Sequence, residues 1–106
     1  MAQLVVVVHM LIQKGRTEEA ISAFAPAIES SHAEPGCSLC ALHRDVHDPD
    51  TLVLIEQWES REAHDRHLEQ PHVQKLTETV SPLVSELPRI TISEPLPVGQ
   101  VAQGLI

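Results

Sequence analysis

The chain has 106 residues, of which 42% are hydrophobic and 21% charged, and its formal net charge at pH 7 is −8. The length fits one domain with one modest core, and the composition is that of a globular protein rather than a disordered one. Only seven Lys and Arg residues are present, which argues against nucleic acid and anionic membranes as partners, because both require clustered positive charge.

The first predicted element is the almost continuously apolar stretch Leu4–Ile12, whose β-branched content indicates a strand buried on both faces. It is too short to span a bilayer and has no basic segment before it, so we expect no leader and a cytoplasmic location. A turn at Lys14–Arg16 follows, and Thr17 is the expected N-cap of a helix that reaches about Ser31. Pro26 should kink this helix or start a second one.

The middle of the chain predicts a second strand over Cys37–Val46 and a third over Thr51–Glu59. Ser60 then caps a helix that runs to Gln70, and Pro71 suits the first position of a further helical segment. The last strand is predicted at Arg89–Ser93.

The order of these elements predicts an α+β protein with the ferredoxin-like β-α-β-β-α-β order and an antiparallel sheet. The domain is expected over residues 1–94, with a C-terminal tail over residues 95–106. The first and third strands are apolar on both faces, as expected of the two central strands. Because helices cover only one face of such a sheet, we predict that a homodimer packed sheet to sheet covers the other.

The two cysteines, Cys37 and Cys40, have the CxxC spacing of redox motifs. They lie within a predicted strand rather than at a helix N-terminus, so the spacing places the thiols on opposite faces of the sheet. We interpret them as buried, unreactive thiols.

The side chains most suited to chemistry are on the third strand and the helix after it. His64 and His67 fall in one stripe of the helix, because residues three apart share a face. Glu56 and Trp58 share one face of the strand. If that face looks toward the helices, one cavity holds all four side chains.

Three interpretations of these side chains compete. A metal site through His64 and His67 lacks a third ligand of convincing spacing, so we expect no metal. The histidines could instead be packing residues, or one imidazole could take a proton from an acidic substrate hydroxyl. The residues alone do not separate the last two.

The remaining histidines are weaker candidates. His9 and His43 lie on strands and could face the cavity or the dimer interface. Three others are most simply solvated: His32, His47 and His72. Glu56 needs a partner if buried, either an imidazole or Arg44.

Residues 55–73, IEQWESREAHDRHLEQPHV, resemble the E-x-W-x-S…H-L-x-x-P-H segment of the antibiotic biosynthesis monooxygenase domain family. The segment EPGC at 34–37 and the Lys14-Gly15 turn are also similar to the family's turns. The resemblance extends over about residues 4–94 and is strongest to the small quinol monooxygenases. It implies a dimeric ferredoxin-like α+β barrel.

The resemblance also implies a function: oxidation of a quinol or polycyclic phenol by O2 without flavin, haem or metal. His67 would be the general base or proton relay, with His64 and Glu56 in support. Trp58 would be a wall of the substrate pocket. The expected substrate contacts are Glu56, Trp58, His9 and Phe24.

Departures from the family pattern keep other functions open. Antibiotic-pathway members have an asparagine and a tyrosine where this chain has Leu54 and approximately His64. The haem-degrading branch needs an asparagine and an axial histidine, but this chain has no asparagine and Thr77 falls near the axial position, so haem degradation is disfavoured. The alternatives are a non-catalytic dimeric domain that binds a small molecule and an isomerase on the same scaffold.

Overall fold

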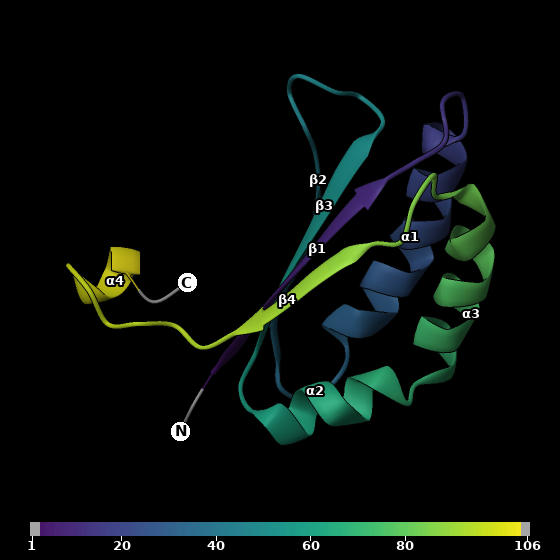
Figure 1. Cartoon of the computed structure of the whole chain (residues 1–106). Helices are drawn as coiled ribbons and strands as arrows, with labels where there is room; N and C mark the ends of the chain where they lie inside the picture. The colour runs from purple at the N-terminus through teal and green to yellow at the C-terminus, as the bar shows by residue number, and fades with distance from the viewer. Residues whose placement is uncertain (1–2, 105–106) are drawn as a thin grey trace.

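The computed structural model describes residues 3–104 and contains one four-stranded antiparallel sheet, with the three longer helices, α1, α2 and α3, on one face (Figure 1). The sheet order β2-β3-β1-β4 confirms the ferredoxin-like α+β fold and the central position of the first and third strands. The elements are, in order, β1 Leu4–Leu11, α1 Thr17–His32, β2 Cys37–Arg44, β3 Thr51–Trp58, α2 Arg61–Leu68, α3 Pro71–Val80, a 3-10 turn Ser81–Leu83, β4 Arg89–Ser93 and α4 Val101–Gly104.

The hydrophobic core lies between the sheet and α1, α2 and α3 (Figure 1). Alternate residues of β1 and β3 point into it, and Leu52 is 1% exposed. Among its other buried members are Met10, Ile12, Ala20, Phe24 and Leu83. Within residues 3–104, no helix is long and apolar enough to cross a membrane.

The opposite face of the sheet is also apolar. Val7 on β1 lies beside Ile55 on β3, which in turn lies beside Ala41 on β2. All three side chains are partly exposed, and Figure 1 shows α1, α2 and α3 on the other face. The tail leaves β4 on this uncovered side, away from α1 and α3 (Figure 1).

The helix boundaries confirm two predictions and correct others. Ser60 caps α2 by accepting a hydrogen bond from the Ala63 backbone N–H at 3.1 Å, and Pro71 begins α3. Thr17 is not an N-cap: Arg16 takes that position, and the Thr17 hydroxyl donates to Asp50 Oδ1 at 2.6 Å. Of the two outcomes expected at Pro26, a kink or a second helix, the second helix is wrong, because α1 continues through the proline. β2 ends at Arg44, before Val46.

The prediction that Cys37 and Cys40 point to opposite faces is wrong. A β-bulge between Cys37 and Leu39 inserts one unpaired residue, so Cys37 pairs with Trp58 and Cys40 with Glu56. Directly opposed residues share a face, and both thiols therefore point toward the helices. Cys37 and Cys40 are free, and burial raises the pKa of Cys40 to about 12.

Candidate functional site

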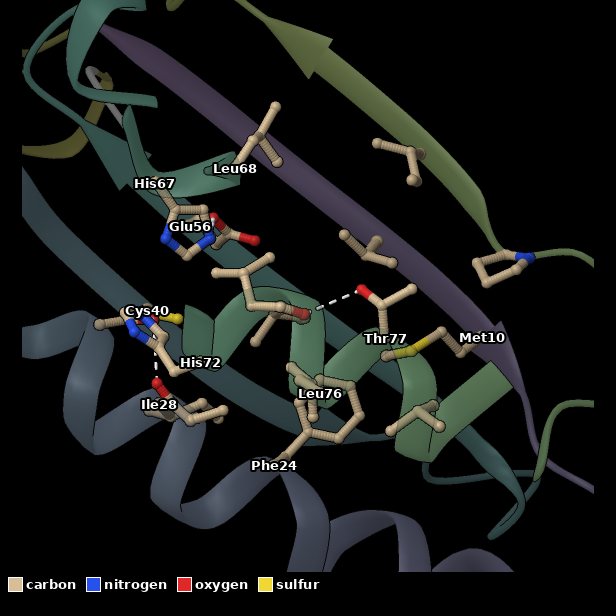
Figure 2. A pocket seen from close by; sticks show the side chains of 18 of the residues that line it. Met10, Phe24, Ile28, Cys40, Glu56, His67, Leu68, His72, Leu76 and Thr77 are labelled. Carbon is tan, nitrogen blue, oxygen red and sulfur yellow. Dashed lines mark hydrogen bonds and ion pairs between the residues drawn. The ribbon is translucent and has the colours of Figure 1, made fainter. Parts of the chain in front are cut away.

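A cavity of about 400 Å³ lies between the sheet and the helices. Its walls are mainly apolar side chains from β1, α1, β3 and α3, among them Met10, Phe24, Ile28 and Leu76. Figure 2 shows His67, Glu56 and His72 toward one end of this space, with Met10 and Phe24 toward the other. The cavity therefore suits a largely apolar molecule with a polar group at one end.

Four buried or half-buried side chains form a polar row at that end, in the order His72, Glu34, His67 and Glu56. His67 Nδ1 lies 2.7 Å from Glu34 Oε2, and His72 Nε2 lies 2.9 Å from the same oxygen. His67 Nε2 lies 3.6 Å from Glu56 Oε1, which is too long for a direct hydrogen bond. Trp58 Nε1 donates to that Glu56 oxygen at 2.8 Å. The His67 imidazole is therefore flanked by two carboxylates.

Local structure fixes the turn that carries Glu34. The Glu34 N–H donates to Ser31 O, and the Cys37 N–H donates to Glu34 O. Gly36 has φ +87°, and a Cβ built on it would lie 2.5 Å from Ala63 Cβ on α2. A glycine at this position allows the turn to approach α2 closely enough for Glu34 to reach His67.

The face of β3 that bears Glu56 and Trp58 does look toward the helices. Of the predicted site residues, His67, Glu56 and Phe24 line the cavity, but Trp58 and His64 do not. The indole of Trp58 is fully buried, with its ring centroid 4.5 Å from that of His67. Trp58 therefore supports the polar row from behind and does not form a cavity wall.

Two predicted side chains lie away from the row. His64 is buried beside Trp58, with ring centroids 6.1 Å apart, and burial lowers its pKa below the ordinary value of 6.5. His9 is exposed on the uncovered face of the sheet, between Val53 and Arg89 on the neighbouring strands. His9 therefore faces away from the cavity, and its predicted role as a substrate contact there is wrong.

The sequence interpretation missed Glu34 and placed His72 in solvent. His72 has 21% of its side chain exposed and lies at the start of α3, where its ring meets Glu34 from the turn after α1. Glu34 lies in the segment EPGC and His72 in the segment QPHV, both of which carry the family resemblance. This resemblance was the one sequence feature that could have indicated the two residues as site residues. Their contact spans 38 positions, so helical or strand spacing could not predict it.

The polar row can bind and release a proton. In its neutral form with Nδ1–H donating to Glu34, His67 carries its lone pair on Nε2, toward Glu56. A proton gained at Nε2 would create an imidazolium between two carboxylates, which stabilise that charge. Every buried side-chain nitrogen and oxygen of the described residues has a partner, so the row is also internally satisfied.

The fold and cavity define a small α+β protein with a largely apolar cavity that suits a small molecule. Residues 3–79 match the family model described as antibiotic biosynthesis monooxygenase. The chain belongs to the antibiotic biosynthesis monooxygenase family.

Solved structures agree with this assignment. A Nitrosomonas europaea protein provisionally described as an antibiotic biosynthesis monooxygenase is 26% identical, with a TM-score of 0.86 over 92% of this chain and 94% of that one. Protein SO0527 from Shewanella oneidensis is 28% identical, with a TM-score of 0.82 over 88% and 90% of the two chains. Rv0793 from Mycobacterium tuberculosis, at 23% identity and a TM-score of 0.85 over 92% and 99%, shares the fold.

A curated relative is known only as the uncharacterized protein sll1783 of Synechocystis sp. It is 27% identical over 89 residues, which are 84% of this chain. The chain spans 60% of the length of that relative.

Proposed function

We propose that the protein is a cofactor-independent monooxygenase that oxidises a quinol or polycyclic phenol with O2. The observation that carries the proposal is the His67 imidazole, 7% exposed, held between Glu34 and Glu56 at the polar end of an apolar cavity. The volume of this cavity, about 400 Å³, and its apolar lining suit an aromatic ring system. The proposed site of action is the cytoplasm.

His67 has the central role in the proposed reaction. A phenolic hydroxyl that reaches His67 Nε2 from the cavity transfers its proton to that nitrogen, and the two carboxylates stabilise the resulting imidazolium. The substrate anion is electron-rich and passes one electron to O2. Recombination of the two radicals forms a carbon–oxygen bond and gives a peroxide anion, which takes the proton back from the His67 imidazolium. Loss of water from the hydroperoxide leaves a quinone that retains one oxygen atom of O2.

The apolar lining contributes by excluding water. A dry cavity strengthens the interaction between the imidazolium and the substrate anion. It also keeps the reactive anion from being reprotonated by solvent before O2 arrives. Trp58 holds Glu56 in position through its indole N–H, so both it and Glu56 are positioning residues in this proposal. Phe24 contacts the ring at the far end.

The proposed assembly is a homodimer that packs the uncovered sheet faces together. The partly exposed Val7, Ile55 and Ala41 at the centre of this face support it, because contiguous apolar surface of this kind favours association. A mass close to 11.7 kDa by light scattering at micromolar concentration would exclude the dimer, whereas twice that mass is expected.

A second candidate is a domain that binds a small molecule without transforming it. It is favoured by the complete pairing of the buried polar groups, which a purely structural row would also show. An isomerase would use the same base without O2.

The test is O2 uptake by chelator-treated protein with a panel of reduced naphthoquinones and anthrones. We expect at least one compound to be oxidised above its uncatalysed rate, with a loss of about 10²–10⁴-fold in His67→Ala, which is the usual contribution of a general base. His47→Ala, at an exposed turn, is the matched control and should retain the rate. Binding without O2 uptake would support the second candidate, and product formation without O2 uptake would support the isomerase.

A further inference from the structure

The donor atoms of Glu34, His67 and His72 all lie within 4.8 Å of one another. The three side chains come from separate elements: the turn after α1, helix α2 and the start of α3. Glu34 Oε2 is shared by both imidazoles, at 2.7 Å and 2.9 Å. Two imidazoles and one carboxylate thus converge on a single point in the folded chain.

This donor set suits a zinc-like divalent cation. Zn²⁺ binds imidazole nitrogen and carboxylate oxygen at about 2.0–2.2 Å, which places donor atoms roughly 3–4 Å apart. The present separations of the three donors, two of them 2.7 and 2.9 Å and none above 4.8 Å, lie close to that spacing. Hard cations such as Mg²⁺ prefer oxygen ligands alone, so the two imidazoles discriminate against them. The net charge of −8 also favours a cation over an anion.

Glu56 strengthens the case from the other side of His67. A metal-bound imidazole donates its remaining N–H to a carboxylate or carbonyl in most protein sites. If His67 binds a cation through Nδ1, its Nε2 carries the proton and points at Glu56 Oε1, 3.6 Å away. Trp58 anchors that oxygen at 2.8 Å, so the acceptor is fixed near His67, and the separation has only to shorten for the hydrogen bond to form.

The cavity can supply the remaining coordination position. His67 and His72 both line it, together with Ser31, whose hydroxyl lies 3.4 Å from His72 Nε2. A cation held by the three side chains therefore adjoins the space in which the substrate is proposed to bind. Such a cation would also connect the turn after α1 to α2 and α3.

We propose that Glu34, His67 and His72 form a binding site for a zinc-like divalent transition-metal ion, and that the bound ion inhibits the protein by withdrawing His67 from proton transfer. The inhibition rests on the proposed function, but the binding site does not. In the metal-bound form, His67 Nε2 carries the proton and faces Glu56, so this nitrogen has no lone pair for a substrate hydroxyl. The metal and the substrate proton therefore compete for the same imidazole.

The binding test uses chelator-stripped, untagged protein without substrate. Calorimetric titration with Zn²⁺ should give one equivalent per chain, and Co²⁺ should give visible absorption bands typical of nitrogen and oxygen ligands. Mg²⁺ should give neither signal. His72→Ala should weaken Zn²⁺ binding by more than about 10-fold, and Glu56→Gln by about 10–100-fold as for other groups that orient metal-bound histidines.

His47→Ala is the matched control, since it removes an exposed histidine outside the cluster. Thermal melting separates lost binding from lost folding: Zn²⁺ should raise the melting temperature of the wild type and of His47→Ala, but not of folded His72→Ala. Absence of one-equivalent binding, or equal affinity in His72→Ala and His47→Ala, would overturn the site.

The inhibition test adds Zn²⁺ to protein that is oxidising a substrate. Loss of activity at one equivalent, reversed by chelator, supports the competition. Full activity in the Zn²⁺-saturated protein would overturn the inhibition while the binding site stands. Activity that requires Zn²⁺ would overturn both the inhibition and the metal-free function, again leaving the site. Activity without any Zn²⁺ binding would overturn only the metal site.

Discussion

Replacing Gly36 by alanine tests whether the turn that carries Glu34 must pack directly against α2. Gly36 and Gly15 have almost the same backbone conformation, with φ +87° and +86°. An alanine in this left-handed region costs about 1–2 kcal/mol at either position. At Gly15, nothing lies within 4 Å of the added Cβ, whereas at Gly36 it would lie 2.5 Å from Ala63 Cβ.

The additional contact at Gly36 cannot be relieved by a side-chain rotation, because Ala63 Cβ is attached directly to the α2 backbone. The turn and the helix must separate, which costs a further ~1–3 kcal/mol as in other overpacked cores. We expect Gly15→Ala to lose about 1–2 kcal/mol of unfolding free energy and Gly36→Ala about 2–5 kcal/mol. The effect of alanine on the unfolded chain is common to both variants and cancels in the comparison.

The assay is urea unfolding followed by circular dichroism, with both variants measured at the same pH and salt concentration. Gly36→Ala should also lower substrate oxidation, since the separation moves Glu34 away from His67 Nδ1. Equal losses of stability in the two variants would refute the close packing of this turn. A wild-type oxidation rate in Gly36→Ala would refute its role in positioning Glu34.

Two further predictions concern titratable groups in the core. Because burial lowers the pKa of His64 below 6.5, the unfolded chain binds more protons than the folded one as pH falls below about 6.5. Stability should therefore decrease from pH 6.5 downward. The urea midpoint should decrease less with falling pH in His64→Gln than in His47→Gln. The same dependence of the midpoint on pH in both variants would contradict the buried neutral imidazole. Burial raises the pKa of Cys40 to about 12, so this thiol should react slowly with iodoacetamide. Mass spectrometry should show modification of the partly exposed Cys37 first and of Cys40 only on unfolding. Fast modification of Cys40 in the folded protein would contradict its burial.

The sequence predicted the fold well because its strands differ in how they are buried. β1 and β3 are apolar on both faces, and both are central in the sheet. Ser60 and Pro71 predicted the starts of α2 and α3, since each acts through local backbone chemistry. The bulge in β2 was not predicted, because an inserted residue changes the facing of Cys37 without an unambiguous local signal.

The candidate site was predicted only in part, for a physical reason. Glu56 and His67 could be placed on their element faces by spacing within one strand and one helix. Glu34 and His72 meet across the fold, and nothing in their local spacing indicates that contact. The burial of Trp58 behind Glu56 likewise depends on how α2 packs on the sheet, and not on the alternation of β3.

The most direct test of the central claim is a turnover of an oxidised substrate under isotopically labelled O2, with chelator-treated wild type and His67→Ala side by side. The account predicts one labelled oxygen atom in the quinone and one in water, at a rate that falls about 10²–10⁴-fold in His67→Ala. Product without labelled oxygen, or equal rates in the two proteins, would contradict it.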